Sequence, residues 1–114
     1  MLMDYGPAYQ GSMGNYATQA LTNVNAQLRS IIPGLTEAKA WSMLGATPMI
    51  GQNDVAGEVF TLADASALAS FAKQKHLGLV SFWAINRDQP GTNNLALYSG
   101  VNTGPFQFHN ILKQ

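Results

Sequence analysis

Cysteine is absent from this chain of 114 residues, which excludes disulfide bonds and any metal site built on thiolates. Charged residues are scarce, because Asp, Glu, Lys and Arg together make up 11% of the chain, and acidic and basic residues balance at six each. Since no basic stripe is present, the composition argues against nucleic acid as a partner. No apolar run approaches the length of a membrane span, so we expect no membrane partner.

Several common catalytic and cofactor-binding patterns are also missing. The histidines His76 and His109 are far apart, and neither has a carboxylate at ligand spacing, so we expect no metal site. The segment from Gly100 to Gly104 lacks the lysine and the glycine spacing of a phosphate-binding loop. No serine lies in a nucleophile-elbow pattern. The sequence therefore predicts neither a metal nor a cofactor.

The length suits a single domain over residues 1–114 that is large enough to bury a core. Strand-like segments alternate along the chain with segments that have helical spacing. The strand-like segments cover residues 1–3, about 42–47 and about 77–83. Alternation of this kind predicts an α/β fold with a parallel sheet and right-handed crossovers.

The boundaries of the first two helices can be predicted from local signals. Apolar residues at three- and four-residue spacing predict a helix over residues 17–31, and Pro33 and Gly34 end it. Thr36, followed by Glu37, begins a short helical turn that leads to the second strand.

Similar signals mark the two later helices. Thr61 and Asp64 resemble a capping box at the start of a helix, and His76 is expected to take the left-handed conformation just past its end. A Gly- and Asn-rich loop follows the third strand. Pro105 is then expected at the first position of a final helix.

The run over residues 77–88 is the most informative part of the chain. It begins as a nearly continuous apolar strand, ends on Trp83, and continues with polar and charged residues. Apolar runs without alternation indicate a strand that is covered on both faces. A large ring at the carboxyl end of such a strand lies where α/β barrels place their active sites, although Trp83 can equally be a core residue.

An acidic residue follows each of the three predicted strands: Asp4, Asp54 and Asp88. In a parallel α/β array these positions share the edge that carries functional sites. Aspartate is also common in loops because its side chain caps helices and turns, so capping is the alternative for each of them. Asp4 is the exception, since it follows its strand directly and is joined to Tyr5.

Three passages of the chain resemble the carboxyl-terminal portion of bacterial family 18 chitinases, which are glycoside hydrolases on a (β/α)8 barrel. They cover residues 1–6, 45–54 and 79–88, and they are similar to strands six, seven and eight of that barrel with the loops that follow. The resemblance implies a partial (β/α)8 TIM barrel made of about the last three β/α units. Residues 1–114 would then form one incomplete segment of a catalytic domain.

The resemblance also implies a sugar pocket. Met1 and Asp4 match the first and last positions of the motif Met-x-Tyr-Asp on strand six, which surrounds the substrate's N-acetyl group. Met3 stands where the tyrosine is common, and Tyr5 comes one position after the motif. Trp83 matches the tryptophan that forms the floor under the sugar at the point of cleavage. The substrate-binding residues expected from the resemblance are Met1, Met3, Asp4, Tyr5, Asn53 and Trp83.

The resemblance implies a mechanism of which this chain holds only one part. In the family, the glutamate of an Asp-x-x-Asp-x-Asp-x-Glu motif on strand four is the general acid, and the substrate's own N-acetyl oxygen is the nucleophile. No such motif occurs in these residues, and Glu37 and Glu58 lie in other contexts. We therefore expect no catalytic residue here and no chitin hydrolysis by the chain alone. The resemblance further predicts a cis peptide bond between Trp83 and Ala84.

Expectations about partners follow from the incomplete barrel. Three parallel strands leave two open edges and one bare face, which favours association with the missing N-terminal part, self-association or a rearranged fold. The resemblance implies chitin or chito-oligosaccharide as the ligand and a secreted parent protein. Two alternatives remain at this point: a non-catalytic carbohydrate-binding or assembly module on an α/β scaffold, and an α/β domain of another enzyme.

Overall fold

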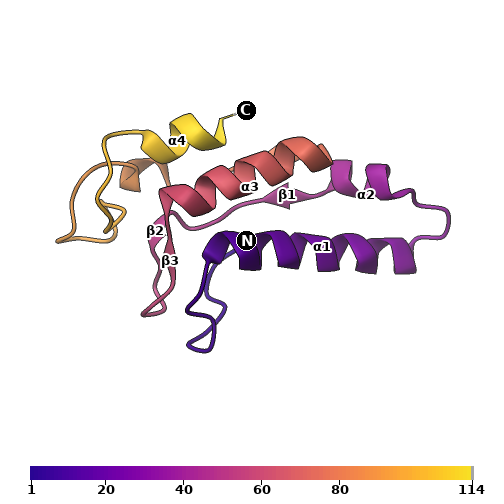
Figure 1. Ribbon diagram of the computed structural model, residues 1–114, viewed down its shortest axis with the longest axis horizontal. Coiled ribbons are helices and arrows are strands. Elements are labelled where there is room, and N and C mark those ends of the chain that lie inside the picture. The colour runs from indigo at the N-terminus through magenta and orange to yellow at the C-terminus, as the bar shows by residue number, and fades with distance from the viewer. Residues whose placement is uncertain (114) are drawn as a thin grey trace.

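The computed structural model describes residues 1–113, and in the view of Figure 1 its extended segments run between two long helices. Helices α1 and α3 pack against each other, and α4 packs on α3 (Figure 1). The elements in chain order are α1 (Met13–Ile31), α2 (Glu37–Met43), β1 (Gly45–Ala46), β2 (Gly51–Gln52), β3 (Val59–Phe60), α3 (Leu62–Lys75), β4 (Leu79–Val80), a 3-10 turn (Ile85–Arg87) and α4 (Gln107–Leu112).

Three extended segments run parallel to one another, as the alternating pattern predicts. β1 pairs in parallel with β4, and the pairing continues beyond these short elements, where Met49 forms a parallel bridge with Trp83. On the other side of the middle segment, Leu2 forms a parallel bridge with Pro48. The middle segment therefore lies between the first and the third, and helices connect consecutive segments.

The helices cover only one face of these segments. Ala46 and Phe82 belong to the side that packs with the core, and Ala46 is fully buried. Leu79 and Trp83 belong to the other face and are 59% and 55% exposed. The prediction that the third strand is covered on both faces is therefore wrong for the chain as described. One face of the third strand is uncovered because residues 1–113 supply a single layer of helices.

The core is formed where α1 and α3 cross the sheet. Its members include the apolar side chains Leu21, Phe60, Leu68 and Phe108, each at most 4% exposed. Full burial of a side chain of this size contributes about 1.5–3 kcal/mol each. Trp41 of α2 joins the same core and meets the ring of Phe71 edge-on, with the centroids 5.6 Å apart.

The helix boundaries confirm most of the local signals. α1 ends at Ile31, just before the predicted stop at Pro33 and Gly34. Thr36 is the N-cap of α2, and its side chain accepts a hydrogen bond from the Lys39 backbone N–H. Thr61 and Asp64 form the predicted capping box at the start of α3. His76 ends α3 in the left-handed conformation with φ of 55°.

Two predicted strand starts are too early. The second strand was expected from about residue 42, but α2 continues to Met43, because Trp41 is buried as a helical residue and its indole N–H reaches the Glu37 carboxylate at 3.1 Å. The third strand was expected from Leu77, but its backbone N–H still donates to the Ala72 carbonyl at 3.0 Å and closes the end of α3.

The final helix also differs from its prediction. Pro105 is not its first residue, because α4 begins at Gln107 after Phe106, which has φ of 57°. The Phe106 backbone N–H donates to the Asp88 carbonyl at 2.7 Å, so a contact distant in sequence decides where this helix starts. The antiparallel hairpin of β2 and β3 was not predicted, since each of its strands has only two residues and shows no alternating pattern.

Candidate functional site

Three loops meet at the carboxyl end of the parallel segments (Figure 1). They are the loop over residues 4–12, the hairpin of β2 and β3, and the loop over residues 84–106. The hairpin contacts both of the others, because Glu58 accepts a hydrogen bond from Gly6 and the Gln52 N–H donates to the Ser99 carbonyl at 2.7 Å. The edge predicted from the sequence to carry a site is therefore formed by these three loops.

Trp83 lies at this edge with its backbone fixed and its ring accessible. Its N–H donates to the Pro48 carbonyl at 2.9 Å, and its carbonyl accepts from the Ile50 N–H at 3.0 Å. The side chain is 55% exposed, which argues against the alternative that Trp83 is only a core residue of the described chain. The Trp83–Ala84 peptide bond is cis, as the family resemblance predicts.

The first segment adds three of the predicted site residues to the same region. Leu2 donates from its backbone to the Thr47 carbonyl at 2.9 Å and packs its side chain on the core. Because side chains alternate along an extended segment, Met1 and Met3 belong to the opposite face, which is the face of Trp83. Asp4 follows, exposed and with φ of 56°.

The bare face is not purely apolar. Thr47 and Ser81 lie on neighbouring segments, two residues before Met49 and Trp83 respectively, and therefore on the same face as that pair. Their hydroxyl oxygens are 2.7 Å apart. This face thus combines an accessible indole, methionine side chains and a hydroxyl pair, so it offers both apolar surface and hydrogen-bonding groups to a ligand.

Tyr5 is turned toward the helices. Its ring packs beside Tyr9 and Tyr16, with centroid distances of 6.0 and 5.9 Å, and it also contacts the core. Burial raises the pKa of Tyr5 to about 12, and the neighbouring Glu58 carboxylate adds to the shift. Its phenol hydroxyl is buried in the described structure. The structure therefore places Tyr5 in a tyrosine cluster and apart from Trp83.

Asn53 is used within the hairpin. It is 3% exposed, and its side-chain amide donates to the backbone carbonyls of Met49 and Gly51, both at 3.0 Å. Its own backbone N–H donates to the Glu58 carbonyl at 2.9 Å. These bonds fix the turn that follows the middle segment, so the side chain of Asn53 holds the hairpin backbone in place.

The two other acids at strand ends have different surroundings. Asp54 is exposed. Asp88 is fully buried, and its carboxylate accepts hydrogen bonds from the backbone N–H groups of Phe108 at 3.1 Å and His109 at 2.7 Å. The capping alternative is therefore confirmed for Asp88, which holds the start of α4.

Sequence reasoning missed two buried charged residues, Glu58 and Arg87. Glu58 is fully buried and accepts a hydrogen bond from the Gly6 backbone N–H at 2.7 Å. Arg87 is 1% exposed, and its Nη2 and Nε donate to the carbonyls of Gln52 and Tyr98 at 2.6 and 3.3 Å. Burial lowers the pKa of Arg87, and Asp54 opposes that change. No local pattern marks either residue as buried, because their partners are distant in sequence.

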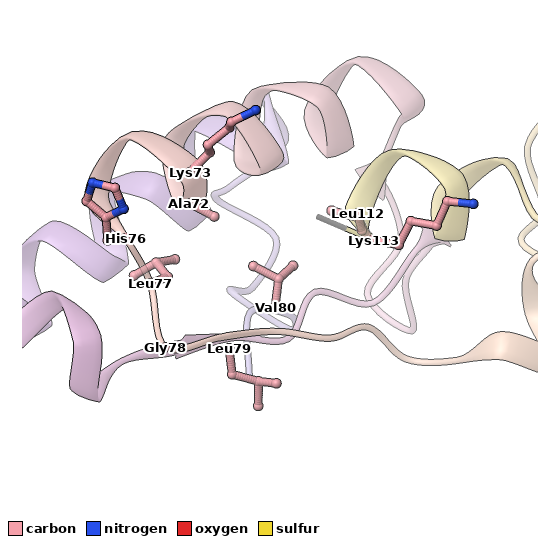
Figure 2. Close-up of a pocket in the computed structure, with 9 residues that line it drawn as sticks. All are labelled: Ala72, Lys73, His76, Leu77, Gly78, Leu79, Val80, Leu112 and Lys113. Atoms are coloured by element: carbon pink, nitrogen blue, oxygen red, sulfur yellow. The ribbon is translucent and has the colours of Figure 1, made fainter.

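A cavity of about 730 Å³ lies away from Trp83. It runs along the unpaired edge of β4, between that strand and helices α3 and α4 (Figure 2). Val80 and Leu77 point from the strand side toward the helices, whereas Leu79 points away from them (Figure 2). Because this edge has no strand partner among residues 1–113, we read the cavity as part of an incomplete sheet-and-helix layer.

Residues 1–113 contain no group of three or more His, Cys, Asp or Glu residues arranged to hold a metal ion. Within the same residues, every helix is too short or too polar for a membrane crossing.

No family model matches the chain, but individual proteins are similar to it. A "Probable bifunctional chitinase/lysozyme" of Escherichia coli (strain K12) is 39% identical over 122 residues, covering 100% of this chain and 13% of that protein. "Endochitinase 11" of Metarhizium anisopliae is 41% identical over 98 residues, covering 79% of this chain and 19% of that protein. The chain thus spans less than a fifth of either relative's length.

Solved structures are similar over nearly the whole chain. The catalytic domain of a hyperthermophilic chitinase from Pyrococcus furiosus superposes with a TM-score of 0.89 at 36% identity, covering 99% of this chain and 37% of that one. Catalytic-site mutants of active domain 2 of a thermostable chitinase from the same organism, complexed with chito-oligosaccharides, give the same values.

Proposed function

This chain is homologous to a segment of chitinase catalytic domains, and from that premise we propose that it forms the last three β/α units of a chitinase-like (β/α)8 barrel. Two observations support the proposal. The extended segments are parallel and in sequential order, each followed by a helix-bearing connection or by α4. The chain also covers 37% of the similar catalytic domain, which is close to three units out of eight.

We further propose that the protein carrying this segment hydrolyses polymers of β-1,4-linked N-acetylglucosamine and is secreted. The reaction is the substrate-assisted retaining route, in which the N-acetyl oxygen of the substrate attacks the anomeric carbon. An acid protonates the oxygen of the leaving sugar in the same step. That acid lies outside these 114 residues, because they contain no Asp-x-x-Asp-x-Asp-x-Glu motif.

The exposure of Trp83 at a fixed strand end is the observation that carries the proposal. A sugar ring has an apolar face of C–H groups, and an accessible indole gives it a flat surface. Covering some tens of Å² in this way contributes on the order of 1 kcal/mol. This ligand class is supported by a similar solved structure, which is a chitinase in complex with chito-oligosaccharides.

The other residues divide into two groups. Met1, Met3 and Asp4 lie toward the ligand: the methionines belong to the Trp83 face, and the exposed carboxyl of Asp4 can orient a sugar hydroxyl or the acetamide. Tyr5 and Asn53 support the pocket from behind, because their side chains are engaged in the tyrosine cluster and in the hairpin.

In this proposal the missing N-terminal part of the barrel packs against the bare face, the unpaired edge of β4 and the cavity beside that edge. Exposed Leu79 then becomes an interior side chain of the closed barrel, and the cavity is filled by the neighbouring unit. Self-association through the same edge is the competing outcome. A non-catalytic carbohydrate-binding module shares the tryptophan floor but needs no barrel partner.

Substitution of Trp83 tests the proposal in the natural polypeptide that contains these residues. We expect Trp83→Ala to weaken binding of chito-oligosaccharides by about tenfold, because the ring supplies on the order of 1 kcal/mol or more of apolar contact. Trp83→Phe should retain part of the affinity. Isothermal titration calorimetry measures both.

Trp41→Phe is the matched control, since Trp41 is the only other tryptophan and is buried among α2 and α3. It should alter stability and leave sugar affinity unchanged. Equal binding by wild type and Trp83→Ala would overturn the assignment of the sugar floor.

A further inference from the structure

The hairpin of β2 and β3 is tied to the loop that follows the first segment by Glu58. Its Oε1 accepts a hydrogen bond from the Gly6 backbone N–H, 52 residues away, at 2.7 Å. The backbone of Glu58 is fixed in turn, because its carbonyl accepts from Asn53 and its N–H donates to Val55 at 3.1 Å. A side chain held in this way limits how far Gly6, and hence Asp4 two residues earlier, can move from the hairpin.

Arg87 ties the opposite side of the hairpin to the chain that follows Trp83. Its Nη2 donates to the Gln52 carbonyl of β2 at 2.6 Å, and its Nε donates to the Tyr98 carbonyl at 3.3 Å. Arg87 ends the 3-10 turn that begins two residues after Trp83. The hairpin is thus held on one side to the loop with Asp4 and on the other to the strand end with Trp83.

Neither Glu58 nor Arg87 touches the accessible face, since the two residues are 0% and 1% exposed. Removing such side chains from water is costly unless hydrogen bonds compensate, and an apolar side chain of similar volume often serves stability as well. Their contacts to backbone groups distant in sequence give these charges a geometric use that an apolar side chain lacks.

We propose that Glu58 and Arg87 are positioning residues that make the β2–β3 hairpin a bracket between Asp4 and Trp83. The bracket sets the spacing between the carboxyl of Asp4 and the ring of Trp83. Its role toward a sugar rests on the proposed function, whereas its role in holding the loops does not.

The first test needs no ligand and compares Glu58→Ala with Glu58→Gln in the natural polypeptide. Alanine removes the acceptor, so hydrogen exchange at the Gly6 amide should accelerate about tenfold or more, as expected for losing a hydrogen bond of ordinary net strength. Glutamine keeps an oxygen in the same place and should preserve most of the protection. Site-resolved exchange measured by NMR reports both.

A spectroscopic readout separates the charge of Glu58 from its shape. Glu58→Gln removes a carboxylate beside Tyr5, so the pKa of the Tyr5 phenol should fall below about 12 in an ultraviolet titration. It should stay above the ordinary value of about 10, because burial is the larger cause of the shift.

The second test concerns the sugar. In the same polypeptide we expect Glu58→Ala to raise KM for chito-oligosaccharides about tenfold with a smaller change in kcat, because the pocket is misplaced while the catalytic acid outside this chain is untouched. Glu58→Gln should restore KM. Glu37→Gln is the control, since Glu37 is the only other glutamate and lies on α2.

Unchanged Gly6 exchange in Glu58→Ala would overturn the bracket, and accelerated exchange with KM equal to wild type would overturn its role in positioning the sugar site. If the wild-type polypeptide neither binds nor cleaves chito-oligosaccharides, the proposed function fails and takes the sugar role of the bracket with it. The Gly6 result then still decides whether Glu58 holds the two loops together.

Discussion

Asp64 joins two helices through a single carboxylate. It accepts hydrogen bonds from the Ser12 hydroxyl at 2.8 Å, the Gly14 backbone N–H at 2.9 Å, and the Thr61 hydroxyl and backbone N–H at 2.7 and 2.9 Å. Burial alone raises the pKa of Asp64, but the hydrogen bonds from Thr61, Gly14 and Ser12 outweigh it and lower the pKa overall. The sequence predicts only the local half of this arrangement, the capping box with Thr61.

The lowered pKa gives the stability a defined dependence on pH. A carboxyl group whose pKa is lower in the folded state stabilises the fold above its unfolded value of about 3.9, and this contribution is lost as pH falls through the folded pKa. We expect Asp64→Asn to reduce the free energy of unfolding by about 1–3 kcal/mol at pH 7 and by less near pH 3. Urea denaturation at the two pH values measures the difference.

Asp54→Asn is the matched control for this prediction, because Asp54 is exposed in a loop. It should change the stability by less than about 0.5 kcal/mol at either pH. An equal loss for Asp64→Asn at pH 7 and pH 3 would contradict the assignment of the pH dependence to this carboxyl.

At the scale of elements, the close approach of α1 to α3 depends on a glycine. An added Cβ at Gly14 would lie 2.9 Å from both the Cα and the Oδ1 of Asp64, closer than side-chain atoms normally come to a neighbouring backbone. Helical spacing places residues 13–31 on a helix but does not indicate how near the next helix lies. The small residue at this position allows the start of α1 to reach the Asp64 carboxylate.

Gly14→Ala should therefore destabilise the fold even though alanine is the better helix former. We expect a loss of about 1–3 kcal/mol, because the overpacked contact is with backbone that cannot move easily. Thermal unfolding followed by circular dichroism measures it. Gly104→Ala is the control, since its nearest neighbour would be at 3.5 Å, and a loss as large at Gly104 would contradict the packing explanation.

The whole molecule is a thin slab of 49 × 30 × 19 Å. Helices cover one face of the parallel segments, and the other face leaves Met1, Leu79 and Trp83 exposed at 78%, 59% and 55%. A surface of this kind in combination with an unpaired strand edge favours association. In the proposed barrel the same face becomes the interior, and the catalytic acid comes from the part that closes it.

Because the proposed catalytic acid lies outside these residues, we predict that the 114-residue chain alone is inactive. The purified chain should release no chromophore from a chitobiose glycoside, because it contains no Asp-x-x-Asp-x-Asp-x-Glu motif. Co-expression with the N-terminal part of the natural barrel should restore activity, and the Trp83→Ala chain should restore much less. Measurable release of chromophore by the chain alone would contradict this prediction. A stable monomer in light scattering would argue against association through the open edge.

The sequence by itself determined the alternation of strands and helices, most helix ends and the residues of the chitinase resemblance. These features depend on near neighbours: the Thr61 capping box, the left-handed His76 and the apolar run that ends at Trp83 all lie within a few residues of their partners. The sequence leaves the alternatives for Trp83 and Asp88 open, because the same residues are consistent with either.

Only the tertiary structure decided which side chains are accessible at the strand ends and which hold the loops. Asp88 caps α4 across 20 residues, Glu58 reaches Gly6 across 52, and Tyr5 turns into a cluster with α1. Trp83 is accessible because the described chain provides one layer of helices and nothing opposite it. The physical reason is that burial and hydrogen bonding at these positions depend on segments brought together by folding, and local sequence patterns carry no information about those partners.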